Sequence, residues 1–201
     1  IFVYTLAAYL SGTYNVLQLA ANNNEIENIS FYDTKSAAGV IRHIAVTAQK
    51  MAQAGKSIED IKVYSQKACE HSITYVLPGS LEQLRKNGRV KGAVAALSNL
   101  LKIKLCVYLA WETNEIEKFG TDRSERRLFQ SVYDDLEKRG YASDEYKYYI
   151  PECDGLARAE QFKQFLLEKN PQAETEFMNL PAGIAAHVGL DTFGLQVVLK
   201  G

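Results

Sequence analysis

Phe2–Leu6 (FVYTL) followed by Leu10–Tyr14 (LSGTY) predicts a buried strand, a turn and a helix that begins near Gly12 and runs toward Asn22. The β-branched and aromatic run suits a covered parallel strand, and Ser11 with Gly12 supplies a capping hydroxyl and a glycine at the helix start. A helix start presents unpaired amide N–H groups and the positive end of the helix dipole, and both favour an anion. The functional hypothesis is that Ser11 holds a carboxylate there. The simpler interpretation, which these residues alone favour, is that Ser11 only caps its helix.

The composition has no strong charge bias. Of 201 residues, 23 are basic and 24 are acidic, so the chain lacks the excess of basic residues that is typical of nucleic-acid-binding proteins. No apolar run is long enough to span a bilayer, so no transmembrane segment is expected. The cysteines Cys69, Cys106 and Cys153 form no C-x-x-C pair, which argues against a disulfide framework or a zinc site and favours a reducing, cytoplasmic location. The chain opens at Ile1 inside a strand, so we expect it to be part of a longer protein.

Residues 1–71 alternate between strands and helices. The expected elements after the first helix are a strand over Ile29–Asp33, a helix over Ala37–Ala54 ended by Gly55, and a helix over Ile58–Cys69 capped by Ser57. This alternation is typical of an α/β unit with a mostly parallel sheet, in which ligands lie beyond the carboxyl ends of the strands. Ser11 and the corner at Asp33 and Thr34 should therefore share one ligand-binding edge.

Residues 72–201 have a different character, because all four prolines lie there and short strands follow one another. The expected strands are Ile73–Leu77, Ile103–Trp111, Ile116–Phe119, Lys147–Ile150, Glu174–Asn179 and Gly194–Leu199, and the expected helices are Ser124–Lys138 and Ala157–Glu168. The short separation of the second and third strands predicts a hairpin. We infer an α/β protein with an N-terminal α/β domain, 1–71, and a C-terminal α+β domain, 72–201, whose sheet is largely antiparallel.

Four short motifs occur along the chain in a fixed order. They are Leu10–Tyr14, Asp33–Ser36, Gly79–Lys104 and Ala186–Gly189. In order and spacing they resemble the LSGTY, D-S/T-x-S, LxxLxxGGRI…LLxIKP and H-x-G-P-G motifs of the DegV family, which are bacterial fatty-acid-binding proteins. No single motif would suffice, but together they extend over essentially the whole chain. The resemblance implies a two-lobed DegV-like fold whose first lobe lacks the family's N-terminal portion.

The resemblance also implies a binding protein that presents its ligand to a partner. Family members hold one long-chain fatty acid, with its carboxylate between the lobes and its tail in an apolar tunnel. In well-studied members a separate ATP-dependent kinase subunit phosphorylates the bound acid. By motif, the expected carboxylate-binding residues are Ser11, Gly12, His187 and Arg89. No cofactor or metal is expected besides the fatty acid, and a transient contact with a membrane surface is compatible with this role.

A basic tract at Arg123–Arg127 resembles the family's R-x-x-K segment near the edge that meets the kinase. Arg123 and Arg126 are therefore expected to dock the partner. A basic cluster at a helix start opposes the helix dipole, which invites a functional explanation. An ordinary solvated surface explains the cluster equally well.

One departure and two alternatives stay open. Gly189-Leu190-Asp191 stands where the family has Gly-Pro-Gly, so Asp191 would add a negative charge near the bound acid. A stand-alone serine hydrolase or acyl-transfer enzyme would use Ser11 as nucleophile and His187 as base, but Ser11 lacks a G-x-S-x-G elbow. A nucleotide-binding domain is the weakest alternative, because neither glycine-rich phosphate motif is present.

Overall fold

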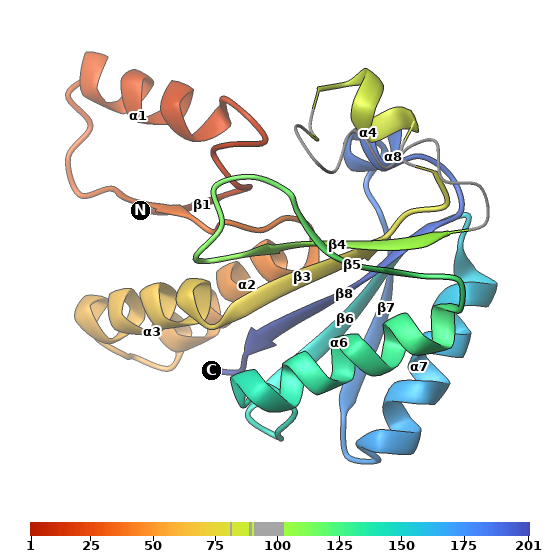
Figure 1. Cartoon of the computed structure of the whole chain (residues 1–201). Coiled ribbons are helices and arrows are strands. Elements are labelled where there is room, and N and C mark those ends of the chain that lie inside the picture. Colours follow the sequence, from red (N-terminus) through yellow and green to blue (C-terminus); the bar gives the residue numbers. More distant parts are fainter. Residues whose placement is uncertain (81, 89, 91–102) are drawn as a thin grey trace.

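The computed structural model describes residues 1–80, 82–88, 90 and 103–201 of the chain (Figure 1). In chain order the elements are β1 (Phe2–Thr5), α1 (Thr13–Asn23), β2 (Ser30–Asp33), α2 (Gly39–Gln53), α3 (Ile58–Glu70), β3 (Ser72–Leu77), α4 (Glu82–Lys86), β4 (Lys104–Ala110), β5 (Glu117–Asp122), α6 (Glu125–Arg139), β6 (Tyr146–Cys153), α7 (Leu156–Lys169), β7 (Glu174–Asn179), α8 (Ala182–Val188) and β8 (Thr192–Leu199). Each strand and long helix expected from the sequence is present, with ends shifted by a few residues. The short helices α4 and α8 were not expected.

The strands form two sheets. β1 and β2 pair in parallel, and the other six strands lie in the order β5-β4-β3-β8-β6-β7. In the larger sheet β6 and β7 are parallel, while the remaining neighbours in the described part of the chain are antiparallel. The expected largely antiparallel second sheet is therefore confirmed. The division of the chain at residue 72 into two domains stays a prediction.

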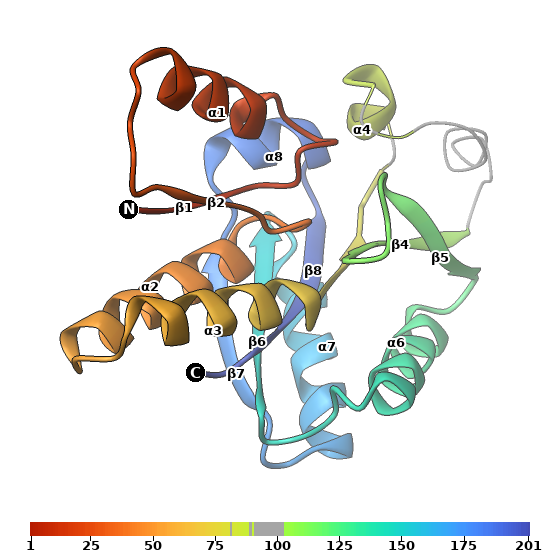
Figure 2. The ribbon, with the colours of Figure 1, turned by 90° about the vertical axis from the view of Figure 1, so that its left-hand side faces the viewer.

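Helices separate and cover the two sheets (Figures 1 and 2). α1 lies on one face of the small sheet, and α2 and α3 lie on the other face. α2 packs between the sheets, where Val40 belongs to a buried cluster with Tyr4 of β1 and Val198 of β8. α6 and α7 pack on the large sheet around Phe129 and Phe162, whose rings lie 4.9 Å apart. Burial of one such ring contributes roughly 1.5–3 kcal/mol, so this cluster anchors the large sheet.

Local sequence signals explain where several helices begin and end. Ser57 Oγ accepts a hydrogen bond from the Asp60 N–H at 3.0 Å, and Asp60 Oδ2 accepts one from the Ser57 N–H at 3.1 Å. This reciprocal capping box starts α3 as Ser57 predicted. Gly55 and Gly140, which follow α2 and α6, have φ values of 75° and 74° in the left-handed region that favours glycine. None of the helices described here combines the length and the apolar character needed to cross a membrane.

Candidate functional site

An apolar cavity of about 380 Å³ lies among the loop after β1, the start of α2, strands β3, β4 and β8, and helix α8. Its wall includes Leu10, Val76, Leu109 and Ile184. The volume lies within the roughly 300–1,000 Å³ of small-molecule sites. Such a wall offers hydrophobic contact to an aliphatic chain and few hydrogen bonds along its length.

Ser11 and His187 are far apart in the sequence, yet both line this cavity. Ser11 Oγ lies 2.8 Å from Thr13 Oγ1 and accepts a hydrogen bond from the Thr13 N–H at 3.3 Å. The N-cap of α1 is Gly12, so Ser11 supports the helix start from one residue further out than predicted. His187 Nδ1 is buried and has no hydrogen-bond partner in the described part of the chain. Because buried polar atoms are nearly always hydrogen-bonded, this nitrogen is suited to a polar atom of a ligand.

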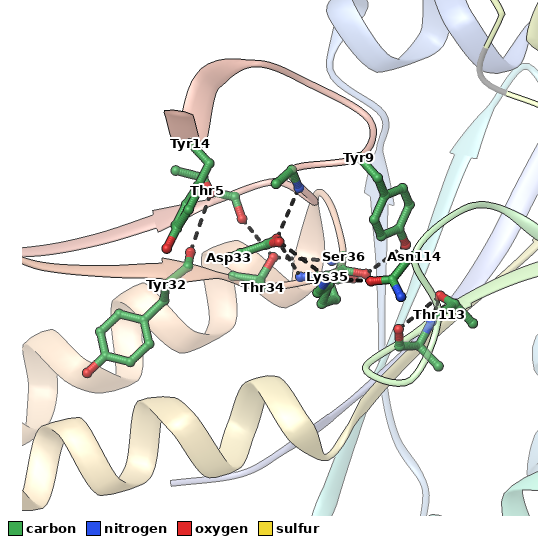
Figure 3. A network of polar contacts seen from close by, with 12 residues as sticks. Thr5, Tyr9, Tyr14, Tyr32, Asp33, Thr34, Lys35, Ser36, Thr113 and Asn114 are labelled. Carbon is green, nitrogen blue, oxygen red and sulfur yellow. Dashed lines mark hydrogen bonds and ion pairs between the residues drawn. The ribbon is translucent and has the colours of Figure 1, made fainter. Parts of the chain in front are cut away.

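Asp33 fixes the loop that carries Ser11 (Figure 3). Its Oδ1 accepts hydrogen bonds from the backbone N–H groups of Ala8 and Lys35, each at 3.1 Å. Lys35 Nζ lies 3.7 Å from Asp33 Oδ2 and donates to Asn114 Oδ1 at 3.0 Å. The loops that follow β1, β2 and β4 are thereby held together, and the corner at Asp33 adjoins the Ser11 loop as the sequence predicted.

The other predicted site residues either lie away from the apolar cavity or fall outside the residues that the structure describes. Gly12 lines a neighbouring polar hollow of about 420 Å³, which Ser11 also borders. Arg89 lies outside the described residues. Arg123 and Arg126 are exposed at the start of α6, away from the cavity wall, and Arg126 Nη2 lies 3.1 Å from Glu168 Oε2. Within the described ranges, no cluster of three or more His, Cys, Asp or Glu side chains is arranged to hold a metal ion.

Asp191, the departure noted after α8, is paired with a cation. Its Oδ2 lies 3.2 Å from Nη1 of Arg158, which also pairs with Glu125 and lies over the ring of Phe193. Burial alone would lower the pKa of Arg158, but the hydrogen bonds and charges of Glu125 and Asp191 raise it. A Cβ on Gly79 would lie 2.7 Å from Asp191 Cβ, so only glycine allows this close approach. The negative charge of Asp191 is therefore compensated by Arg158.

The geometry gives the serine-hydrolase alternative little support. Ser11 Oγ is engaged with Thr13, and no carboxylate among the described residues is hydrogen-bonded to His187. A nucleophile and its base need a hydrogen bond of about 2.6–3.2 Å and a third group that orients the base. Neither requirement is met by the described residues around this cavity.

A second hollow, of about 490 Å³, lies between α2 and the first residues of β6 and β7. Arg42 Nη1 and Lys147 Nζ lie 2.6 Å and 2.8 Å from the carboxylate oxygens of Glu176. His43 also lines this hollow, and burial followed by the nearby charge of Lys147 lowers its pKa to about 4. A wall of ion pairs is a poor match for an aliphatic chain, so the apolar cavity is the better candidate site.

The sequence analysis missed the polar residues of the apolar cavity other than Ser11 and His187, among them Thr74 and Gln196. Their side chains are buried, with 4% and 1% exposure. The available signal was a glutamine inside the otherwise apolar run Gly194–Leu199. Because a buried amide must be hydrogen-bonded, such a residue marks a specific contact.

Comparisons with known proteins agree with this architecture. The sequence model described as "uncharacterised protein, DegV family" matches residues 1–200. A DegV domain-containing protein of Clostridium perfringens is 26% identical over 200 residues, covering 97% of this chain and 68% of the relative. A fatty acid-binding protein of Thermotoga maritima is 27% identical over 206 residues, covering 98% of this chain and 69% of the relative.

A solved structure has the same fold. The Fatty Acid Kinase (Fak) B3 protein of Streptococcus pneumoniae, loaded with linoleic acid, superposes with a TM-score of 0.85 at 22% identity, covering 100% of this chain and 72% of that chain. At this identity the likeness shows the fold alone. The chain thus spans about two thirds of the length of the relatives that it matches. With a family match over residues 1–200 and the same α/β architecture, this chain belongs to the DegV family.

Proposed function

We propose that this chain binds one long-chain fatty acid in the apolar cavity, with the carboxylate beside Ser11 and His187. The observation that carries the proposal is that one apolar cavity is lined by both residues, and that the buried His187 Nδ1 has no partner among the described residues. A relative named as a fatty acid-binding protein supports the same ligand class, as does the solved structure of the same fold that is loaded with linoleic acid.

Hydrogen bonds to the carboxylate are the main energetic requirement. Moving a carboxylate out of water is costly unless charged or multiple hydrogen bonds replace its hydration. In the arrangement that we propose, Thr13 donates to Ser11 Oγ, and the Ser11 hydroxyl proton is then directed to the carboxylate. His187 Nδ1–H supplies a second hydrogen bond. The tail gains hydrophobic free energy of about 0.8 kcal/mol for each buried CH₂ group.

We further propose that a separate ATP-dependent kinase subunit acts on the bound acid. A carboxylate oxygen would attack the γ-phosphorus of ATP, forming an acyl phosphate and releasing ADP, and the kinase would supply the nucleotide site. The exposed Arg123 and Arg126 are our candidates for the contact with this subunit. Because this role depends on ATP, we propose that the protein acts in the cytoplasm.

Lipid analysis of the purified protein tests the proposed ligand. Native mass spectrometry and organic extraction should find a stoichiometric fatty acid in the wild type. Ser11→Ala should bind about 10–150-fold more weakly, because a hydrogen bond to a charged group contributes roughly 1.5–3 kcal/mol.

Ser131→Ala is the matched control, since Ser131 is an exposed serine of α6 that donates to the Arg127 carbonyl. A wild-type protein without fatty acid would contradict the proposed function, and equal binding by Ser11→Ala would contradict the role of Ser11. Turnover of a chromogenic ester that disappears in Ser11→Ala would instead support the hydrolase alternative.

A further inference from the structure

The turn that leads into α2 has a backbone conformation that normally requires glycine. Ala38 has φ 47° and ψ −113°, the mirror image of the second residue of a type II turn. Such a conformation is strained for an L-residue with a side chain, and it persists only when its surroundings impose it. Ala37 and Ala38 both line the apolar cavity, so the strained turn forms part of its wall.

The side chain of Gln196 holds this turn from both sides. Its Oε1 accepts a hydrogen bond from the Gly39 N–H at 2.8 Å, and its Nε2 donates to the Ala37 carbonyl at 2.9 Å. The two bonds bracket Ala38 and fix the peptide groups on each side of it. Gln196 comes from β8 in the large sheet, so the amide joins this sheet to the entry of α2.

The amide of Gln196 is itself held in one orientation. Nε2 also donates to Thr74 Oγ1 at 3.1 Å, and Thr74 Oγ1 lies 2.8 Å from Ser36 Oγ. Gln196 is 1% exposed, so its amide has no competing bonds to bulk water. A buried network in which each polar group has a partner specifies a single geometry.

The turn is also blocked from behind. A Cβ on Gly39 would lie 2.8 Å from Tyr149 Cγ and 2.9 Å from both Gln196 Oε1 and Met178 Sδ. The start of α2 therefore packs directly against the large sheet and cannot move closer to it. Both the close approach and the strained residue beside it depend on the position of the Gln196 amide.

We infer that Gln196 is a positioning residue for ligand binding: it holds Ala38 in a glycine-type turn and thereby sets the cavity wall formed by Ala37 and Ala38. This inference rests on the proposed function, because the cavity is taken to be the fatty-acid site. Without the amide, Ala38 relaxes toward negative φ, and the wall moves with it. Gln196 need not touch the ligand for this effect.

A double-mutant cycle of Gln196→Met and Ala38→Gly tests the inference. Methionine keeps the length of the side chain but removes the amide, and glycine accepts the turn without strain. Binding of palmitic acid to delipidated protein is measured by calorimetry, and thermal midpoints are measured without ligand. Ala52→Gly is the control, since it makes the same change on the exposed side of the same helix.

Five results are expected. Ala38→Gly raises the thermal midpoint by about 2–4 °C, whereas Ala52→Gly lowers it. Palmitic acid affinity stays within about twofold of wild type in Ala38→Gly and falls about tenfold in Gln196→Met. The double variant regains most of the affinity, because glycine readopts the turn unaided. A loss of affinity caused by removing a direct contact between the Gln196 amide and the ligand would not be rescued in this way.

Other results would overturn the inference. They are a lower midpoint in Ala38→Gly, unchanged affinity in Gln196→Met, or a double variant as weak as Gln196→Met. If the wild type binds neither palmitic acid nor an extracted lipid, the proposed function fails instead. The thermal midpoints, measured without ligand, test the strain independently of the proposed function. If the change in the double variant equals the sum of the changes in the two single variants, Gln196 does not impose the strain at Ala38.

Discussion

Replacing Asp33 by alanine should destabilise the protein and loosen the loop that carries Ser11. Asp33 Oδ1 accepts two backbone N–H bonds, from Ala8 and Lys35, and its side chain is 16% exposed. Hydrogen bonds to a charged acceptor contribute roughly 1.5–3 kcal/mol each. Using the lower value for this partly exposed group, the loss is about 3 kcal/mol, or roughly 6–12 °C in the thermal midpoint for a chain of this size.

The asparagine variant separates the charge of Asp33 from its geometry. Asp33→Asn keeps an oxygen for both backbone donors but loses the attraction to Lys35, so we expect a loss of about 1 kcal/mol. Asp134→Ala, which changes an exposed aspartate of α6, should stay within about 0.5 kcal/mol of wild type. Urea unfolding followed by circular dichroism gives all three free energies of unfolding.

Ligand binding shows whether this anchor acts on the proposed site. Asp33→Ala should weaken palmitic acid binding, but by less than Ser11→Ala, because the serine is displaced and not removed. The reasoning is refuted if Asp33→Ala unfolds within about 1 °C of wild type. It is also refuted if the alanine and asparagine variants lose equal stability, since the two backbone donors would then contribute nothing.

Two further predictions concern the exposed arginines before and in α6 and the partly buried His43. Reversing both charges in Arg123→Glu/Arg126→Glu should cost about 0–1 kcal/mol of stability, because Arg126 pairs with Glu168 in solvent. The variant should still bind palmitic acid, but a purified fatty acid kinase subunit should form less acyl phosphate with it. An equal loss of palmitic acid binding would contradict this division of roles. Burial and Lys147 lower the pKa of His43 to about 4, so the unfolded chain binds a proton that the folded protein excludes, and stability should fall as pH drops from 6.5 toward 4. His43→Gln should flatten the pH dependence of unfolding above pH 4.5, and a His43 NMR titration near 6.5 would contradict the assignment.

Strands and long helices were predictable because their signals are local. Ser57 before an apolar helical pattern indicated the N-cap of α3, and the structure adds the reciprocal bond from Asp60. The helices α4 and α8 were missed, since they span only 5 and 7 residues and carry too little apolar periodicity. Pro181, the N-cap of α8, was the one local sign of a helix start there.

Only those site residues that belong to a recognised sequence motif could be predicted. The matches at Ser11 and His187 named two residues that line one cavity, although no local rule relates positions so far apart. Gln196 was missed because its partners, Ala37 and Gly39, are identified only by the fold. The compensation of Asp191 by Arg158 likewise depends on how α7 packs beside β8.

The central position of β8 has a consequence for synthesis of the protein. β8 lies between β3 and β6, yet it follows every other strand in the sequence. While the ribosome is still making residues 192–199, the large sheet exists only as two separate pieces, β5-β4-β3 and β6-β7. During that interval the edges of β3 and β6 lack their neighbour, and unpaired strand edges of this kind invite aggregation.

Closure of the large sheet also completes the cavity. The hydrogen bond between Gly39 and Gln196 spans 157 positions of the chain, so its formation must await the last strand. Pairings of such long range form slowly, because the intervening chain has to be ordered first. A nascent chain therefore has no finished apolar cavity until β8 has joined the large sheet.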